Sequence, residues 1–295
     1  MDKFARQNPM DWKSNVGQAQ PAAMNAIAAH GNSPPIKRNS MNESFPQCKL
    51  PAAAIIEVWT IDLDRPLNPE ANLEGILSIE ERNRAERYIY SKDASRFRLC
   101  RAMLRLGLAW YLETTPQKIA LATNRHGKPC VAECSTLNFN VSHSGGLGVI
   151  AFTTVGEVGV DVEAIRCDVG AVEIASAHFT RIEAAMIAAA ATPQEQASAF
   201  LRLWTRKEAL LKATGCGLLG GLDGVDVSHG PLDQVRLCNA TGDRAELFWR
   251  VQDLEWIEGY AGAVAAPAGN WSVLQRPVRF EDAIHGSLGR IFGVM

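Results

Sequence analysis

The alternation of apolar and polar positions predicts a mixed chain of short strands and amphipathic helices. Residues 55–59 form an apolar, β-branched run typical of a first strand. Ser78 followed three residues later by Glu81 is a capping box, which predicts a helix beginning there. Apolar residues at helical spacing predict a second helix over residues 94–112.

The second half of the chain continues this mixture. Residues 138–144 are interpreted as a strand ending in a polar loop at Ser142-His143-Ser144, and Gly215 is expected to end the longest helix. The remaining expected elements are a hairpin of strands 147–152 and 158–163 around residues 155–157, helices 169–177, 181–191 and 194–213, and strands 247–254 and 260–265. This order predicts an α+β protein of two similar lobes.

Composition suggests where those lobes begin and end. Residues 1–49 are rich in Asn, Gln, Ser, Pro and Ala, which is typical of a disordered or weakly ordered leader. We expect an N-terminal lobe over residues 50–157, a C-terminal lobe over 158–275 and a C-terminal tail over 276–295. No run of 18 apolar residues is present, so the sequence predicts no membrane span.

Charge and cysteine content narrow the class of protein. The net charge of -2 gives no reason to expect nucleic-acid binding. Residues 78–106 nevertheless carry eight basic and four acidic side chains, enough to attract a small polyanion. The seven cysteines are odd in number and lack zinc-site spacing, which favours free thiols in a cytoplasmic protein.

Two acidic residues lie in the strand expected over 158–163. Because side chains alternate along a strand, Asp161 and Glu163 should face one way and Val160 and Val162 the other. The simplest interpretation is a solvated polar face of an antiparallel sheet. The alternative is a pair of carboxylates neutralised by a cation.

The helix over 194–213 carries a third carboxylate. Trp204, Glu208 and Leu211 share a helix face, so Glu208 lies among apolar neighbours and needs a partner. Lys212, four residues on, is close enough to pair with it, and an ordinary helical ion pair is one interpretation. Convergence of Asp161, Glu163 and Glu208 on a divalent metal beside Lys212 is the other, and it indicates phosphoryl chemistry.

Two further segments carry polar chemistry. Ser142-His143-Ser144 is a poor candidate for a nucleophile and base, since adjacent residues seldom form such a pair. These three residues are better interpreted as hydroxyl and imidazole donors to a phosphate, or as ordinary turn residues. Gly127-Lys128-Pro129 predicts a turn with a positive charge.

Taken in order, these motifs resemble those of the 4′-phosphopantetheinyl transferases, in the long single-chain type that activates carrier domains of peptide and polyketide synthases. The resemblance covers about residues 55–265. It rests on Gly127-Lys128-Pro129, on the Phe-Asn-x-Ser-His-Ser pattern of residues 139–144, on the Gly-Val-Asp-Val-Glu of residues 159–163, and on the Trp-x-x-Lys-Glu-Ala-x-x-Lys of residues 204–212. Glu81 departs from the family, where a basic residue is expected.

The resemblance implies a pseudo-dimer of two lobes, each an antiparallel sheet packed with helices, with coenzyme A bound in the cleft between them. Asp161, Glu163 and Glu208 would hold Mg²⁺, with Mn²⁺ as an alternative, and Glu208 and Lys212 would be catalytic. The residues implied to bind coenzyme A are Arg84, Arg96, Lys128, Ser142, His143, Asp161 and Lys212.

The implied reaction transfers the 4′-phosphopantetheine group of coenzyme A to a serine of an apo acyl or peptidyl carrier protein, releasing 3′,5′-ADP. Another Mg²⁺-dependent phosphotransferase or phosphohydrolase, or a non-catalytic homologue, is the alternative. Both lobes lie in one chain, so a monomer is expected. The expected partners are coenzyme A and the carrier domain, with neither nucleic acid nor membrane.

Overall fold

The computed structural model describes residues 50–67, 72–124, 128–132, 134, 136–215, 222–228, 232–237, 247–255 and 257–284. The expected leader over residues 1–49 lies outside the described residues, and so does Gly127. None of the helices in the described part of the chain is both long and apolar enough to cross a membrane.

The first half of the chain forms the strands and helices that its apolar pattern predicts. The elements are β1 (Ile55–Asp62), α2 (Ile79–Ala85), α3 (Ser91–Tyr111), the 3-10 helix η1 (Pro116–Lys118), β2 (Leu121–Thr123), β3 (Pro129–Val131), β4 (Asn138–Ser144) and β5 (Leu147–Thr153). The capping box is confirmed, because the Ser78 side chain accepts from Glu81 N and the Glu81 side chain accepts from Ser78 N.

The second half begins with one strand, continues with three helices and returns to strands. The elements are β6 (Gly159–Ala164), α4 (Ala171–His178), α5 (Arg181–Ala188), α6 (Pro193–Thr214), β7 (Leu232–Leu237), β8 (Leu247–Asp253), β9 (Tyr260–Pro267), β10 (Ser272–Pro277) and α7 (Phe280–Ile284). Helix α6 starts at a capping box of Thr192 and Glu195 and ends at Gly215, whose φ of 68° is the left-handed conformation that glycine tolerates.

The strands in the described part of the chain form two four-stranded sheets and one two-stranded sheet. The orders are β10-β1-β5-β4, β6-β9-β8-β7 and β2-β3. The expected hairpin of residues 147–152 and 158–163 is wrong, because β5 pairs with β1 and β4 while β6 pairs with β9. Every residue of β5 is buried, so its main-chain N–H and C=O groups need strand partners on both edges. The chain instead crosses to the other sheet after Gly156, whose φ is 138°.

The last described segment returns to the first sheet. Strand β10 runs parallel to β1, with Ile56 opposite Val273, whereas the other paired strands described are antiparallel. The tail expected over residues 276–295 therefore begins inside β10, and its described part continues into α7. Apart from this parallel pair, the expected α+β class with antiparallel sheets packed with helices is confirmed.

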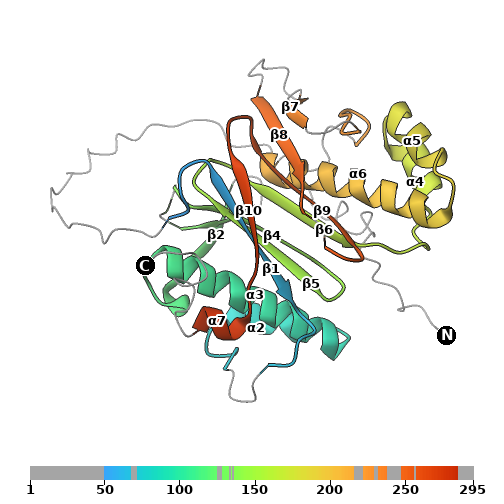
Figure 1. The fold of residues 1–295 in the computed structure, drawn as a ribbon. Coiled ribbons are helices and arrows are strands. Elements are labelled where there is room, and N and C mark those ends of the chain that lie inside the picture. Colours follow the sequence, from blue (N-terminus) through green and yellow to red (C-terminus); the bar gives the residue numbers. More distant parts are fainter. Residues whose placement is uncertain are drawn as a thin grey trace, which may run out of the picture. The chain divides into compact units, whose positions relative to one another are not determined.

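The sheets and helices are arranged in layers (Figure 1), and apolar clusters of described residues hold these layers together. Helix α3 covers one face of the first sheet, where its Leu104 and Leu108 belong to the same cluster as Trp59 and Phe152. The opposite face of that sheet packs on the second sheet through residues such as Val58, Val149, Val160 and Val162. Helix α6 covers the outer face of the second sheet through Ala209, Leu210 and Ala213. The edge strands β4 and β6 are thereby brought together.

Candidate active site

Strands β4 and β6 and helix α6 place the predicted acidic residues beside one another. Gly159 lets β6 approach α6 so closely that an added Cβ would lie 1.9 Å from Ala209 O and 2.4 Å from Ala213 N. Only glycine permits this contact. It sets Asp161, two residues further along β6, next to the face of α6 that carries Glu208 and Lys212.

Asp161 is the buried centre of the group. Only 4% of its surface is exposed, so the solvated sheet face is not what the structure shows. Its Oδ1 atom accepts from Ser142 Oγ at 2.7 Å and from Lys212 Nζ at 2.6 Å. The ion pair expected between Glu208 and Lys212 is thus replaced, because the lysine reaches across to β6 and also donates to Val160 O at 3.2 Å.

The two glutamates hold their protons more tightly than usual. The pKa of Glu208 is raised to about 7, first by burial and then by the negative charge of Asp161. The pKa of Glu163 is raised to about 6 by the same two causes in the same order. Three carboxylates therefore share one poorly solvated region that disfavours their full ionisation.

This group fits a divalent cation by its chemistry. Carboxylate oxygens are the ligands that Mg²⁺ prefers, and the buried Asp161 Oδ2 has no hydrogen-bond partner among the residues that the structure describes. Within the described part of the chain, no three His, Cys, Asp or Glu side chains already converge closely enough to hold a metal. A cation held by all three carboxylates would therefore require these side chains to move closer together.

Ser142, His143 and Ser144 lie in β4, not in the loop that the sequence suggested. Their side chains alternate, so the two serines and the histidine have different neighbours. Ser142 Oγ donates to Asp161 and Ser144 Oγ donates to Glu163 Oε2 at 2.7 Å. The Ser142 hydroxyl also accepts from Lys212 Nζ at 3.0 Å, so the predicted contact of Ser142 with a coenzyme A phosphate would require its donation to Asp161 to break.

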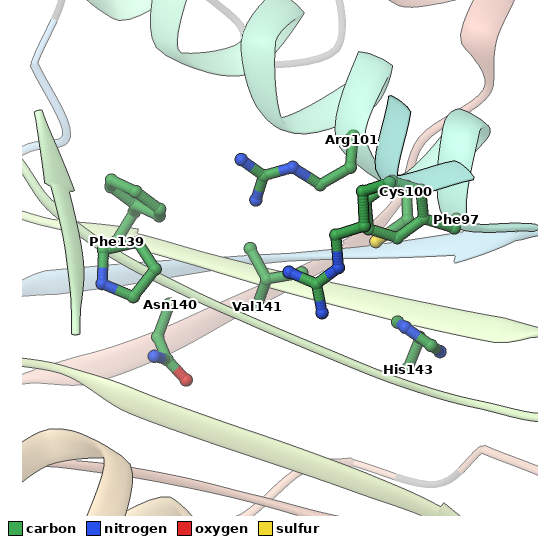
Figure 2. Close-up of a pocket in the computed structure, with 9 residues that line it drawn as sticks. Phe97, Cys100, Arg101, Phe139, Asn140, Val141 and His143 are labelled. Carbon is green, nitrogen blue, oxygen red and sulfur yellow. The ribbon is translucent and has the colours of Figure 1, made fainter. Parts of the chain in front are cut away.

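His143 belongs to a pocket between β4 and helix α3 (Figure 2). The residues lining it are Arg84, Phe97, Cys100, Arg101, Pro129, Phe139, Asn140, Val141 and His143. The Arg84 guanidinium carbon lies 5.2 Å from the centre of the Phe97 ring, a cation–π contact. Surrounding protein atoms, and then Lys212 and Arg84, lower the pKa of His143 although part of the ring is exposed. This cationic, partly aromatic pocket suits an anion.

Two predicted binding residues are engaged by acidic neighbours. Arg96 makes a two-point contact with Asp64, with Nε at 2.7 Å and NH2 at 2.6 Å from the carboxylate oxygens. Lys128 pairs with Glu157 at 2.5 Å and is almost covered. Neither lines the pocket of Figure 2, so anion binding by these two residues would first require the existing pairs to open.

The departure at Glu81 has a structural reason. Its buried carboxylate accepts from Arg101 Nε at 2.8 Å and from Arg105 Nε at 2.5 Å, and it closes the capping box of α2. An acid at this position therefore fastens α2 to α3. Arg101, which also lines the pocket, supplies positive charge from the neighbouring helix.

Comparison with known proteins identifies the family. The model of the 4′-phosphopantetheinyl transferase superfamily matches residues 157–265, and that of the 4′-phosphopantetheinyl transferase N-terminal region matches residues 69–155. A protein of Synechocystis sp., provisionally named a 4′-phosphopantetheinyl transferase, is 36% identical over 171 residues, which are 57% of this chain and 68% of that protein. The chain belongs to the 4′-phosphopantetheinyl transferase superfamily.

Two further relatives resemble this transferase over much of its length. The 4′-phosphopantetheinyl transferase HetI of Nostoc sp. is 30% identical over 219 residues, which are 73% of this chain and 89% of HetI. The 4′-phosphopantetheinyl transferase Sfp of Bacillus subtilis is 30% identical over 174 residues, which are 58% of this chain and 76% of Sfp.

The sequence reasoning missed several residues of this site. Arg101 and Phe97 line the pocket, and Asn140 and Ser144 bind β6 through their side chains. The alternation of residues 140, 142 and 144 was a usable signal for the last two, because all three share one side of a strand. Nothing in the local pattern around Phe97 and Arg101 indicated a pocket.

Proposed function

We propose that this transferase moves the 4′-phosphopantetheine group from coenzyme A to a serine hydroxyl of an apo acyl or peptidyl carrier protein. The observation that supports it most is the group of buried Asp161 and half-buried Glu163, Glu208 and Lys212 beside a cationic pocket. The carboxylates suit a cation on a pyrophosphate, and the pocket suits the remaining anionic part of coenzyme A.

The residues around Asp161 have distinct proposed roles. The serine oxygen of the carrier attacks the phosphorus that bears pantetheine, and the bond from this phosphorus to the bridging oxygen of 3′,5′-ADP breaks. Glu208 takes the hydroxyl proton, directly or through a water, because its pKa of about 7 suits a general base. Lys212 stabilises the negative charge of the leaving phosphate. Its ammonium lies 2.6 Å from Asp161 Oδ1, which supports this role.

Asp161, Glu163 and Glu208 are the proposed Mg²⁺ ligands, with Mn²⁺ as a substitute. When bound, the ion would neutralise pyrophosphate charge as a Lewis acid. Ser142 and Ser144 orient two of these carboxylates by donating to them. His143 and Arg84 are proposed to bind coenzyme A from the pocket, while Arg96 and Lys128 would contribute only after leaving Asp64 and Glu157.

Binding of Mg²⁺ should weaken as the pH falls. The pKa of Glu208 is about 7 and that of Glu163 about 6, and a metal ligand must lose its proton. Both pKa values are raised by folding, so stability from these groups is greatest at low pH and is lost as pH rises through the folded pKa values. Added Mg²⁺ should therefore raise the melting temperature more at about pH 8 than at about pH 6.

The measurement is thermal unfolding with and without Mg²⁺ at both pH values. The Glu208→Gln variant is the control, because an amide at this position cannot titrate. It should lose most of the pH dependence of the Mg²⁺ effect. An equal Mg²⁺-induced shift at both pH values in the native protein would contradict the assignment of these ligands.

His143→Ala should weaken coenzyme A binding more than it slows the reaction. The imidazole lies in the cationic pocket, and a hydrogen bond to a charged group contributes about 1.5–3 kcal/mol. Steady-state kinetics should show the coenzyme A KM rising about tenfold or more with kcat nearly unchanged. His178→Ala on α4, outside the pocket, is the matched control. A fall in kcat at constant KM would assign His143 to a different step.

The proposed docking partner is a carrier domain, and the proposed working unit is a cytoplasmic monomer. The exposed basic side chains between residues 78 and 106 are Arg84, Arg87 and Lys92, and they could receive an acidic carrier surface. Arg101 and Arg105 are already paired with Glu81. Contacts of this kind weaken with ionic strength, so the KM for the carrier is expected to rise with salt.

Release of 3′,5′-ADP separates this reaction from its alternative. A transferase should release the nucleotide in proportion to the apo carrier supplied, and none without it. A Mg²⁺-dependent phosphohydrolase would release nucleotide from coenzyme A with no carrier present. Carrier-independent release at the same rate would therefore sink the proposal.

A further inference from the structure

The two large sheets meet at the edge strands β4 and β6. Strand β4 ends the order β10-β1-β5-β4, and β6 begins the order β6-β9-β8-β7. Side chains bridge these edges: Asn140 Oδ1 accepts from Val160 N at 2.9 Å, and Ser144 Oγ accepts from Ala164 N at 3.1 Å. We call these two contacts the β4–β6 bridge. They satisfy main-chain N–H groups at an edge that a neighbouring strand would otherwise pair.

The β4–β6 bridge is built from buried side chains. Asn140 and Ser144 are each only 8% exposed, and they lie on either side of Ser142 in the alternation of β4. The residues that they hold on β6 are 160 and 164, which flank Asp161 and Glu163. The bridge thus encloses the part of β6 that carries both acidic side chains.

Each contact of the bridge also fixes main chain next to Asp161 or Glu163. The Ser144 hydroxyl accepts from Ala164 N and donates to Glu163 Oε2, so one oxygen fixes both the strand and the side chain. The main chain of Val160, just before Asp161, is held at both ends, since its N–H donates to Asn140 and its C=O accepts from Lys212. Loss of either contact would let β6 shift relative to β4, and the carboxylates would shift with it.

We propose that Asn140 and Ser144 are positioning residues, which hold Asp161 and Glu163 in the arrangement that transfer requires. This inference rests on the proposed function for its kinetic consequence. Its geometric part, the side-chain bridge across two sheet edges, can be tested without any turnover.

Amide hydrogen exchange tests that bridge directly. In Asn140→Ala the Val160 amide should exchange at least about tenfold faster, and in Ser144→Ala the Ala164 amide should do so, because each loses its acceptor. Ser144→Thr retains the hydroxyl and should restore protection of Ala164. Asn138→Ala is the matched control, since among the described residues its side chain shows no hydrogen bond to β6. Unchanged exchange in both alanine variants would overturn the proposal.

Kinetics and metal-dependent melting then separate positioning from mere stabilisation. Removal of residues that orient metal ligands lowers activity or metal affinity by about 10- to 100-fold. Asn140→Ala and Ser144→Ala should therefore lower kcat in that range, raise the Mg²⁺ concentration for half-maximal stabilisation, and leave the coenzyme A KM nearly constant. Ser144→Thr should recover both values.

These measurements distinguish a positioning role from a purely structural role, and both from failure of the proposed transfer. Faster exchange with unchanged kcat and unchanged Mg²⁺ dependence, measured per folded molecule, would show a purely structural bridge and overturn the positioning role. If the native protein modifies no carrier, the proposed transfer fails. The positioning of Asp161 and Glu163 is then supported by a weakened Mg²⁺-induced melting shift in the variants and overturned by an unaltered one.

Discussion

Glu208→Gln is expected to reduce transfer by about 10²- to 10⁴-fold, the range that a positioned proton acceptor contributes. The amide has nearly the shape of the carboxylate but cannot accept the serine proton or bind a cation as an anion. At about pH 8 the melting temperature should stay the same or rise, because burial already raises the pKa of Glu208 to about 7 and disfavours its charge. The transfer rate and the melting temperature can be measured on the same preparation of the variant.

Glu173→Gln makes the same chemical change on the exposed first turn of α4 and is the control. It should transfer at the native rate. If Glu208→Gln retained near-native kcat at saturating Mg²⁺, the base would have to lie elsewhere. If it instead unfolded, the residue would be structural, in conflict with the cost that burial imposes on its charge.

Gly159→Ala is expected to cause the largest structural effect of any small substitution at the site. The new Cβ would lie 1.9 Å from Ala209 O, a backbone atom that cannot move without the whole of α6. Overpacking of this kind costs about 3 kcal/mol, at the upper end of its usual range. The melting temperature should fall by about 6–12 °C. Transfer by the remaining folded protein should also fall, because α6 carries Glu208 and Lys212 away from Asp161.

Gly269→Ala provides the matched control, since its added Cβ would meet only a Trp271 ring atom at 4.0 Å. That variant should melt and transfer like the native protein. Native-like stability of Gly159→Ala would mean that β6 and α6 do not approach as closely as described. Thermal unfolding followed by circular dichroism gives the stability of both variants, and the transfer assay gives their activity.

Local patterns predicted most elements and some of their ends. The capping box at Ser78 and the terminating Gly215 work through neighbouring residues, so they can be read from a short window. Strand pairing is a contact between distant segments. The pairing of β1 with β10 joins residues more than 200 positions apart, and no local signal indicates it. The expected hairpin after β5 was wrong for the same reason.

The acidic residues and the lysine of the candidate site could be predicted to lie together, whereas the pocket residues and most contacts could not. The motifs brought Asp161, Glu208 and Lys212 together, and the structure places them beside one another. The ordinary ion pair between Glu208 and Lys212 was one of two interpretations, and the structure instead pairs Lys212 with Asp161, because helical spacing does not show that β6 lies within reach. Arg96 was expected to be available for coenzyme A, and its pairing with Asp64 arises from a residue 32 positions earlier.

The most direct test of the proposed transfer is the mass of a carrier protein after incubation with this protein, coenzyme A and Mg²⁺. Several purified apo acyl and peptidyl carrier domains should be tried, with Glu208→Gln in parallel. We predict that at least one carrier gains the mass of a single phosphopantetheine group on its serine, and that this gain requires Mg²⁺ and is lost in Glu208→Gln. An unchanged mass for every carrier, with folded protein and intact coenzyme A, would contradict the assignment.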